Sequence, residues 1–326
     1  MAAEPRILHI YDAADVGATL VKYGRRAGRP WRHFNVVPPE GTPSSIIGRA
    51  GKLAAGTAWQ SRRAAAILRS DLLHVHSGSR IGVVRSRPVK PFLLHFHGTD
   101  IRTQYYEPAR RPALQWGADH AVKVLYSTPD LREHAEAARA DAVYLPNPVD
   151  LEELPEWRPA GRPRIVFASR WHSSKGGRQQ LELVRALRAA VGHGVELQGL
   201  DWGDGAPQAA ELGVVLVPKM AKPDYLRWLA SAHAVVGQSA GILAMSELQA
   251  IGIGVPVVMQ LGEGYYQSPP VLQGETVEAL AASAAATLAD PAGTSAALGG
   301  RTWLQEHHGP AGLVRRLAAV YAEAAG

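Results

Sequence analysis

The sequence predicts an α/β protein with two doubly wound domains, each built on a parallel sheet. Three observations indicate this class. Short apolar runs of strand length alternate with helical stretches along the chain. The alternation is interrupted by a proline-rich stretch, residues 146–163, and then resumes. With 326 residues the chain exceeds one typical hydrophobic core, so two domains are expected.

Six strands are expected in the N-terminal half. They are Ile7–Ile10, His33–Val37, Leu72–Val75, Phe92–Phe96, Val122–Tyr126 and Ala142–Leu145. Each is a short run rich in apolar residues, and helical stretches lie between most of them. Such alternation is typical of parallel strands joined by helices.

The break between the halves falls at Pro146–Asp150, and prolines and polar residues continue over Leu154–Pro163, a composition that suits a linker. We therefore expect an N-terminal domain over residues 1–148 and a C-terminal domain over residues 149–310. A last helix over residues 311–326 has helical periodicity and is free to pack back toward the N-terminal domain.

The second half repeats the alternation. Its expected strands are Ile165–Ala168, Glu196–Gln198, Val214–Val217, Ala234–Gly237 and Val255–Gln260. Its expected helices are Arg178–Ala190, Tyr225–Ala232, Leu243–Ile251 and Thr276–Leu288. Two such domains facing each other across a cleft would direct both sets of strand ends toward one ligand.

Composition narrows the class of protein. The chain is 46% hydrophobic and 20% charged, as in ordinary globular proteins. It has no cysteine, which excludes disulfides, a thiol nucleophile and cysteine metal sites. No signal-peptide-like segment and no apolar run near the ~20 residues of a membrane span occur. We expect a cytoplasmic protein, and the abundance of Ala, Gly and Arg is typical of a high-GC bacterium.

Positive charge is concentrated in the first half. Residues 1–150 contain 21 basic and 13 acidic side chains, against 14 and 16 in the remainder. A basic half attracts phosphorylated ligands, anionic membrane surfaces or nucleic acid. Because the arginines are scattered with few aromatic residues between them, no nucleic-acid partner is expected. The charge allows weak contact with an anionic membrane.

A strand, a Ser/Gly loop and a helix follow one another over Arg164–Gly177, and the loop carries Arg170 and Lys175. Glycines let backbone amides approach an anion, and the next helix adds its positive N-terminal dipole. The two cations would complete a clamp for a diphosphate. Taken alone, the segment equally suits a solvent-facing turn in which the cations only add solubility.

Further motifs occur in a specific order over nearly the whole chain. They are Asp15–Thr19, Asp71–His76, Lys90–Asp100, Leu145–Asp150, Gly254–Val258, Arg301–His308 and Leu317–Tyr321. With Arg170 and Lys175 among them, this order resembles the retaining GT-B glycosyltransferases, in particular glycosyltransferase family 4.

The resemblance implies a hexosyltransferase that needs no metal and no cofactor. Its C-terminal domain would bind a nucleotide-diphosphate sugar, of UDP or GDP type, and its basic N-terminal domain a small-molecule or glycan acceptor. Specialised metabolites, envelope components and polysaccharide precursors all fit as acceptors. The oligomeric state is not indicated.

The resemblance also implies roles for single residues. His97 would contact the donor sugar near the reacting carbon and help hold charge as the glycosidic bond breaks. Asp100 would cap the next helix or hold the His97 turn, with support favoured over direct catalysis. Gly17, in a loop after the first strand, would let the backbone approach phosphate or sugar. Met220 and its neighbour Lys219 would contact the base through the main chain.

Other histidines near this motif are expected to be structural, namely His74, His76 and His95. A metal site at His95, His97 and Asp100 is disfavoured, because His95 and His97 share a strand face that belongs to a core-lining pattern.

The largest departure from the family lies at its paired glutamates, which are separated by seven residues. Gly241 and Gln249 occupy the two positions, and Glu247 could substitute for the second if the helix register shifts. Gln249 can still hydrogen-bond ribose hydroxyls. Gly241 implies an unusual sugar, backbone recognition or lost activity. Amides at Leu243 and Ala244, at the start of the helix, could receive the diphosphate.

The missing glutamates keep a second hypothesis open, a catalytically silent GT-B protein that binds a nucleotide or a partner. Two other enzyme classes are disfavoured. A glycoside hydrolase needs a pair of opposed carboxylates, and no matching pair stands out. A nicotinamide-dependent oxidoreductase needs Gly-x-Gly-x-x-Gly after the first strand, which is absent.

Overall fold

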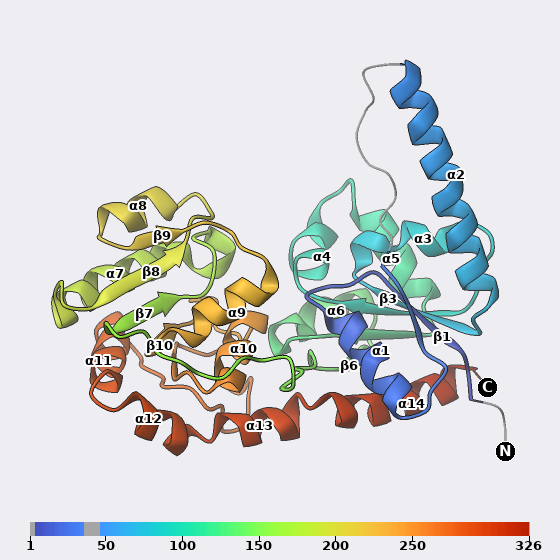
Figure 1. The fold of residues 1–326 in the computed structure, drawn as a ribbon. Helices are drawn as coiled ribbons and strands as arrows, with labels where there is room; N and C mark the ends of the chain where they lie inside the picture. The colour runs from blue at the N-terminus through green and yellow to red at the C-terminus, as the bar shows by residue number, and fades with distance from the viewer. Residues whose placement is uncertain (1–3, 36–45, 326) are drawn as a thin grey trace. The chain divides into compact units, whose positions relative to one another are not determined.

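The computed structural model describes residues 4–35 and 46–325, which form two domains (Figure 1). Domain 1 contains the described residues up to Pro148 and those from Pro310 onward. Domain 2 spans Val149–Gly309. Val36 and Val37, at the end of the expected second strand, lie outside the described residues.

Domain 1 is built on a parallel sheet whose described strands lie in the order β2-β1-β3-β4-β5-β6. These strands are β1 (Ile7–Ile10), β2 (Arg32–Phe34), β3 (Leu72–His76), β4 (Phe92–Phe96), β5 (Lys123–Tyr126) and β6 (Val143–Tyr144). The strand order reverses between β1 and β3. Open α/β sheets bind ligands at the carboxyl ends of the strands beside such a reversal.

Helices pack on both faces of this sheet. They are α1 (Val16–Arg26), α2 (Ile46–Leu68), α3 (Gly82–Arg85), α4 (Thr99–Arg102), α5 (Arg111–His120), α6 (Arg132–Ala138) and α14 (Pro310–Ala325). Although α14 is last in the chain, it packs against α1 and β3. No described helix is both long enough and apolar enough to span a membrane.

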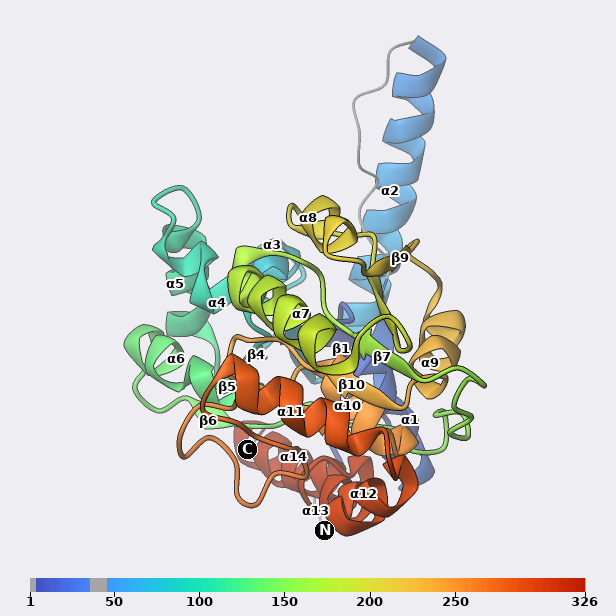
Figure 2. The same cartoon turned by 90° about the vertical axis from the view of Figure 1, so that its left-hand side faces the viewer.

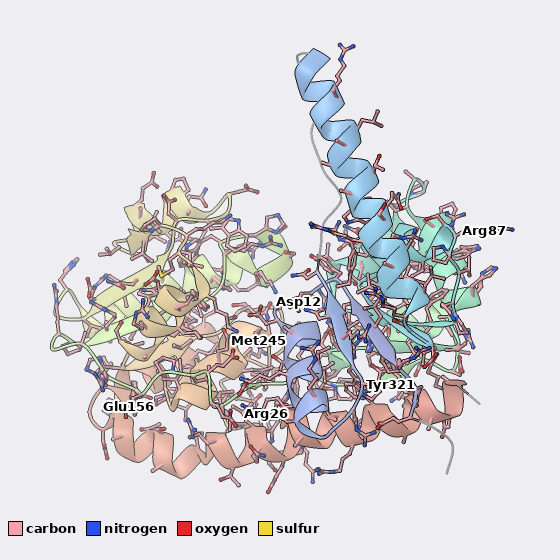
Figure 3. All side chains as sticks on the ribbon, turned by 45° about the vertical axis from the view of Figure 1, so that its right-hand side comes forward. Asp12, Arg26, Arg87, Glu156, Met245 and Tyr321 are labelled. Atoms are coloured by element: carbon pink, nitrogen blue, oxygen red, sulfur yellow. The ribbon has the colours of Figure 1, made fainter. Side chains whose placement is uncertain are left out.

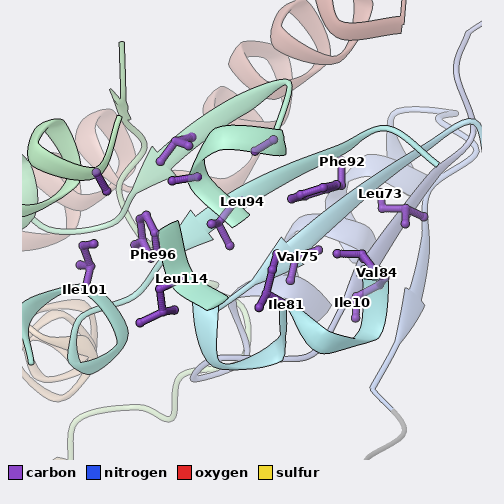
Figure 4. Close-up of a cluster of buried hydrophobic side chains, with 14 of the residues drawn as sticks. Ile10, Leu73, Val75, Ile81, Val84, Phe92, Leu94, Phe96, Ile101 and Leu114 are labelled. Atoms are coloured by element: carbon purple, nitrogen blue, oxygen red, sulfur yellow. The ribbon is translucent and has the colours of Figure 1, made fainter. Parts of the chain in front are cut away.

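The two faces of the domain 1 sheet differ in chemistry, because side chains alternate along each strand. One face is an apolar core that includes Ile10, Val75 and Leu94 (Figure 4). The opposite face carries buried histidines, namely His9, His74, His76 and His95, each 0% exposed. Buried polar groups need hydrogen-bond partners, so this histidine face requires a defined set of contacts.

Domain 2 repeats the architecture with a parallel sheet in the order β11-β10-β7-β8-β9. Its described strands are β7 (Arg164–Phe167), β8 (Glu196–Leu200), β9 (Val215–Val217), β10 (Ala234–Val236) and β11 (Val257–Val258). Here the order reverses between β7 and β10. The expected Val255–Gln260 strand is only two residues long in the structure. Pro256, directly before these residues, has no backbone N–H to donate to the neighbouring strand.

The sheet of domain 2 has an apolar core on each face. Its helices are α7 (Gly177–Val191), α8 (Ala206–Glu211), α9 (Lys222–Ala230), α10 (Met245–Ile253), α11 (Val277–Thr287), α12 (Pro291–Leu298) and α13 (Gly300–His307). Among them α7 and α11 lie side by side (Figure 2).

The proline-rich stretch Leu154–Pro163 is not a linker. It lies within domain 2, where the indole N–H of Trp157 donates to the carbonyl of Ala232 at 2.8 Å. The backbone N–H groups of Arg158 and Ala160 donate to neighbouring carbonyls at 3.0 and 2.9 Å. Proline favours extended backbone in a tethered strap as much as in a free linker, so composition did not separate the two.

Gly24, inside α1, is expected to tolerate no side chain. A Cβ there would lie 2.3 Å from Cε3 of Trp31, a ring that is 1% exposed. Gly24→Ala should therefore destabilise domain 1 by about 1–3 kcal/mol through overpacking, although alanine is the better helix former. Urea unfolding measures the effect. Gly51→Ala in α2, where a Cβ meets nothing within 4 Å, is the control and should be neutral or stabilising; equal stability of the two variants would contradict the packing argument.

Candidate functional site

A pocket of about 460 Å³ opens in domain 2 at the carboxyl ends of its strands. It is lined by the last residue of β8, by residues that follow β7, β8 and β9, and by one residue each of α9 and α10. They are Ala168, Ser169, Arg170, Lys175, Leu200, Trp202, Lys219, Met220, Tyr225 and Ser246. The pocket therefore brings together three of the residues expected at a donor site, Arg170, Lys175 and Met220.

The loop between β7 and α7 is held in place by buried contacts. The Trp171 ring is 1% exposed, and its indole N–H donates to the carbonyl of Leu200 at 3.0 Å. Gly176 has a φ of 71°, and a Cβ there would lie 2.6 Å from that of Ser239. The carbonyl of Lys175 accepts the Ser239 N–H at 3.0 Å. These constraints fix the backbone that carries Arg170 and Lys175.

Three cations and two aromatic side chains, Trp202 and Tyr225, line the pocket. The Nζ of Lys219 lies 3.8 Å from the ring centroid of Trp202, and the guanidinium carbon of Arg170 lies 5.4 Å from it. Lys175 lines the same pocket. The Trp202 ring is 41% exposed, so it offers a flat apolar surface beside the cations. Trp202 was missed in the sequence, although an aromatic residue just after a strand at a sheet's carboxyl edge is a usable signal.

The N-terminus of α10 lies beside the pocket through Ser246. The helix begins at Met245, two residues later than expected. The Leu243 N–H donates to the Tyr266 hydroxyl at 3.0 Å, and the Ala244 N–H donates to the Glu247 carboxylate at 2.9 Å. In this conformation both amides are already used, and the first-turn amides that follow them are the ones without intrahelical acceptors.

Glu247 is 0% exposed, and its carboxylate organises the loop before α10. It accepts the Ala244 N–H, the Ser246 hydroxyl at 2.9 Å and the Gln238 N–H at 3.1 Å. These contacts give Glu247 a structural role in the loop before α10. A glutamate at the third position of a helix is half of the usual capping box, whose other half, Ser or Thr at the N-cap, is replaced here by Ala244.

Gly241 and Gln249, at the positions of the paired glutamates, are not among the residues that line the pocket. Gly241 has a φ of 75°, and its carbonyl accepts the Gly262 N–H at 2.8 Å. The Gln249 side chain is half-buried in α10. A left-handed backbone at Gly241 favours glycine, which gives this substitution a conformational reason.

In domain 1, Asp100 holds the turn that follows β4. Its carboxylate is buried and accepts N–H groups from Gly78 at 2.9 Å, Gly98 at 3.0 Å and Ile101 at 3.0 Å. It also accepts the His97 N–H at 3.2 Å. With four amides around it, Asp100 is a positioning residue, in agreement with the preference for support over direct catalysis.

His97 is half-buried at the end of β4. Its Nε2 lies 3.2 Å from Nδ1 of His76, and the Asn147 side chain hydrogen-bonds the same ring. Burial lowers the pKa of His97 to about 4, against the pull of the Asp100 charge. The ring is therefore neutral at pH 7. It can hydrogen-bond a ligand without carrying a charge of its own.

Gly17 lies inside α1 and not in the preceding loop, where it was expected. Its N–H donates to the Asp12 carboxylate at 3.0 Å. A Cβ at Gly17 would lie 3.2 Å from Nε2 of His33 and 3.3 Å from Cδ2 of His76. The glycine thus lets α1 approach the histidine face. The loop itself is strained, since Tyr11, Ala14 and Asp15 all have positive φ; Asp12 lies in this loop (Figure 3).

Two groups of histidines bring their ring nitrogens within 4.8 Å of one another, His9 with His74 and His76, and His76 with His95 and His97. Such spacing allows either a metal ion or hydrogen bonds between the rings. Burial keeps the pKa of His74, His76 and His95 well below the usual range, so these rings are neutral.

Two doubly wound parallel-sheet domains, one of them with a cationic pocket at its strand ends, are the architecture of the GT-B fold. Residues 12–153, nearly all in domain 1, match the model of the family described as Glycosyltransferase Family 4. This match covers less than half of the 326 residues. No curated protein matches it significantly.

Solved structures are similar over nearly the whole chain. Sucrose-phosphate synthase from Thermosynechococcus elongatus has 16% identity, 98% coverage of both chains and a TM-score of 0.68. HepE from Anabaena, in complex with UDP-glucose, has 13% identity, 97% and 99% coverage and a TM-score of 0.69. A putative UDP-N-acetylglucosamine 2-epimerase from Listeria monocytogenes has 15% identity, 98% and 96% coverage and a TM-score of 0.61. These likenesses confirm the GT-B fold.

Proposed function

We propose that this glycosyltransferase is a retaining hexosyltransferase that takes its sugar from a nucleotide-diphosphate sugar, most simply a UDP-sugar, and needs no metal. One observation carries the proposal: Arg170, Lys175 and Lys219 surround one pocket at the carboxyl ends of the domain 2 strands. HepE, which has the same fold, binds UDP and UDP-glucose, and this supports uracil as the base.

The three cations supply what the leaving group requires. Transfer breaks the bond between the anomeric carbon and a diphosphate oxygen, and negative charge grows on that oxygen as the bond lengthens. Fixed cations offset this charge in the transition state, which is the task that a metal ion performs in other transferases. Trp202 and the main chain at Met220 would hold the base and ribose.

Retention follows most simply if the acceptor attacks the face that the diphosphate leaves. No carboxylate is among the ten residues that line the pocket, so a covalent glycosyl intermediate on this pocket has no nucleophile. We assign the acceptor, a small molecule or glycan, to the basic domain 1. We place the reaction in the bacterial cytoplasm, with weak contact to anionic membrane as a further part of the proposal.

An assay with UDP-glucose, UDP-N-acetylglucosamine and GDP-mannose tests the activity. Chromatography follows free nucleoside diphosphate and new sugar nucleotides, with and without EDTA. We expect slow release of UDP from one donor by hydrolysis, unchanged by EDTA. Conversion of one UDP-sugar into another without release of UDP would favour epimerisation. Release that EDTA abolishes would contradict metal independence.

A catalytically silent nucleotide-binding protein is the second candidate. Its support is specific: Gly241 and Gln249 replace the paired glutamates, and Glu247 is occupied by the loop before α10. Tight UDP binding without turnover of any donor, even after Gln249→Glu, would favour this candidate over the transferase.

His97→Ala is expected to lower turnover roughly 100-fold while leaving UDP binding unchanged, because we propose that the His97 ring contacts the sugar and not the nucleotide. Initial rates and UDP thermal shifts measure the two effects. His120→Ala, at an exposed histidine of α5, is the matched control and should leave both unchanged. Equal rates in the two variants would show that His97 does not take part in the reaction.

A further inference from the structure

Six side chains form one hydrogen-bonded chain on the histidine face of domain 1. Its order is His97, His76, His9, Tyr321, His74 and His95. Successive contacts are His97 Nε2 to His76 Nδ1 at 3.2 Å, His76 Nε2 to His9 Nδ1 at 3.0 Å, His9 Nε2 to Tyr321 Oη at 3.3 Å, Tyr321 Oη to His74 Nδ1 at 2.5 Å and His74 Nε2 to His95 Nδ1 at 3.3 Å. The Tyr321 ring projects from α14 and is 1% exposed (Figure 3).

Every ring inside the chain uses both of its nitrogens. A neutral imidazole has one N–H and one lone pair, so each ring must donate on one side and accept on the other. The phenol likewise donates one hydrogen and accepts another. Once the direction of one hydrogen bond is known, all the others follow. Only two arrangements exist, and they are the reverse of each other.

The contacts of Tyr321 select one of the two directions. Its hydroxyl lies 2.5 Å from His74 and 3.3 Å from His9. A hydroxyl donor makes shorter hydrogen bonds than a ring N–H donor, so the phenol donates to His74 and accepts from His9. His74 then donates through Nε2 to His95.

His95, at the end of the hydrogen-bonded chain, agrees with this direction. In this arrangement Nε2 of His95 carries the hydrogen. That nitrogen is buried and meets no acceptor at good hydrogen-bond geometry within the described residues. The backbone of Leu145 nevertheless acts on His95 as a hydrogen-bond acceptor, which raises the pKa of the ring against its burial. A backbone carbonyl only accepts, so it favours a hydrogen on the His95 nitrogen that faces it.

The hydrogen bonds between Tyr321 and His97 have the same direction. His9 donates to Tyr321, His76 donates to His9, and His97 donates through Nε2 to His76. We propose that Tyr321 is a positioning residue that, through His9 and His76, holds His97 in the Nε2–H tautomer and leaves Nδ1 as a hydrogen-bond acceptor for a ligand hydroxyl. The tautomer is a property of the free protein; its use on a sugar hydroxyl rests on the proposed function.

The same tautomer constrains Asn147, which hydrogen-bonds the His97 ring. A ring that donates through Nε2 offers only a lone pair at its other nitrogen. The hydrogen bond with Asn147 raises the pKa of His97, as an acceptor does, whereas in this tautomer the Asn147 amide must turn its NH₂ group to that nitrogen. Because the nitrogen has a single lone pair, a ligand hydroxyl that binds there would take the place of the Asn147 NH₂ group. A metal ion on His76, His95 and His97 would instead need a lone pair from each ring at one point, which would break the chain.

Nitrogen NMR of the full-length protein, labelled with ¹⁵N at the histidine rings, tests the proposal. Long-range ¹H–¹⁵N spectra distinguish protonated from unprotonated ring nitrogens, and a His97→Gln variant assigns the His97 signals. We expect Nε2 of His97 to be protonated and Nδ1 to be unprotonated. A protonated Nδ1 in the unmodified protein would overturn the proposal.

Tyr321→Phe tests whether the tyrosine sets this state. The phenyl ring keeps the contact with Trp31, whose ring lies 5.1 Å from that of Tyr321, but removes the hydroxyl. Both ¹⁵N signals of His97 should move toward the average of the two tautomers, although His97 does not touch Tyr321. Unchanged signals would refute the role of Tyr321. Circular dichroism checks the fold, and Tyr106→Phe, at an exposed hydroxyl of domain 1, is the control.

Addition of zinc extends the same experiment. One equivalent of ZnCl₂ should leave the ring signals unchanged. A stoichiometric, EDTA-reversible shift of His76, His95 and His97 would show a metal site and overturn the proposal. Because these measurements need no substrate, they decide the tautomer even if the protein consumes no nucleotide sugar, and so separate its failure from that of the proposed function.

Discussion

Lys175→Ala is expected to remove most of the affinity of domain 2 for UDP. The ammonium group lines the pocket with Arg170 and Lys219, and a charge-assisted hydrogen bond to a diphosphate contributes about 2 kcal/mol, or roughly a 30-fold change in Kd. The thermal shift produced by UDP should fall accordingly, because a ligand raises apparent stability in proportion to the logarithm of its concentration over Kd.

Lys222→Ala is the matched control. Lys222 belongs to the same domain, lies outside the residues that line the pocket and faces Glu153, whose carboxylate is 3.4 Å away. Its replacement should leave the UDP shift unchanged. Uridine without phosphates should shift the Lys175→Ala variant as little as it shifts the unmodified protein. If Lys175→Ala and Lys222→Ala respond alike to UDP, the cations do not bind the diphosphate.

Acidification is expected to unfold domain 1 before domain 2. Burial lowers the pKa of His9 to about 3 and that of His97 to about 4, and holds the pKa of His74, His76 and His95 well below the ordinary value. In the unfolded chain these histidines titrate near 6.5. The folded domain therefore binds fewer protons, and its stability is fully present above about pH 6.5 and falls as the pH drops toward the folded values.

The size of the effect follows from the number of rings. Each buried histidine removes up to about 1.4 kcal/mol of stability per pH unit below its unfolded pKa, so five together remove up to about 7 kcal/mol per unit. A domain stability of about 5–15 kcal/mol is then exhausted within roughly two units. The charge repulsion among the rings acts in the same direction.

Hydrogen exchange followed by mass spectrometry, corrected for the intrinsic rate at each pH, resolves the two domains. Peptides of β1, β3 and β4 should lose protection near pH 5, while those of β7 and β8 keep it. His9→Gln removes one titrating ring and should move the domain 1 transition to lower pH, provided that the variant is folded at pH 7.5. Loss of protection in both domains at one pH would contradict this origin of the acid sensitivity.

Much of the fold could be predicted because its signals are local. The ranges of β1 and β4 agree with the sequence to the residue, since each is a short, mostly apolar run bounded by polar residues or, before β4, by a proline. The loop with Arg170 and Lys175 was also recognisable, because strand, small residues, cations and helix follow one another directly. Leu154–Pro163 was misinterpreted because a proline-rich composition describes backbone preference and not contacts.

The candidate site was predictable only in part. Arg170, Lys175 and Met220 were expected to serve one ligand, and the structure brings them to one pocket. Trp202 and the structural role of Glu247 were missed, although each has a signal in the sequence. The amides of Leu243 and Ala244 could not be judged in advance, because their acceptors depend on how the Tyr266 segment and the first turn of α10 fold.

The sequence by itself determined the two parallel-sheet domains, the phosphate-type loop and the pattern that places histidines on alternate positions of β3 and β4. Strand periodicity and turn chemistry act between near neighbours, so they can be followed along the chain. Only the tertiary structure decided what those histidines do. His74 meets Tyr321, 247 residues away, and this contact sets the direction of the hydrogen bonds between the rings. The proton on a buried ring is set by the partner that the fold brings to it, and no local pattern specifies that partner.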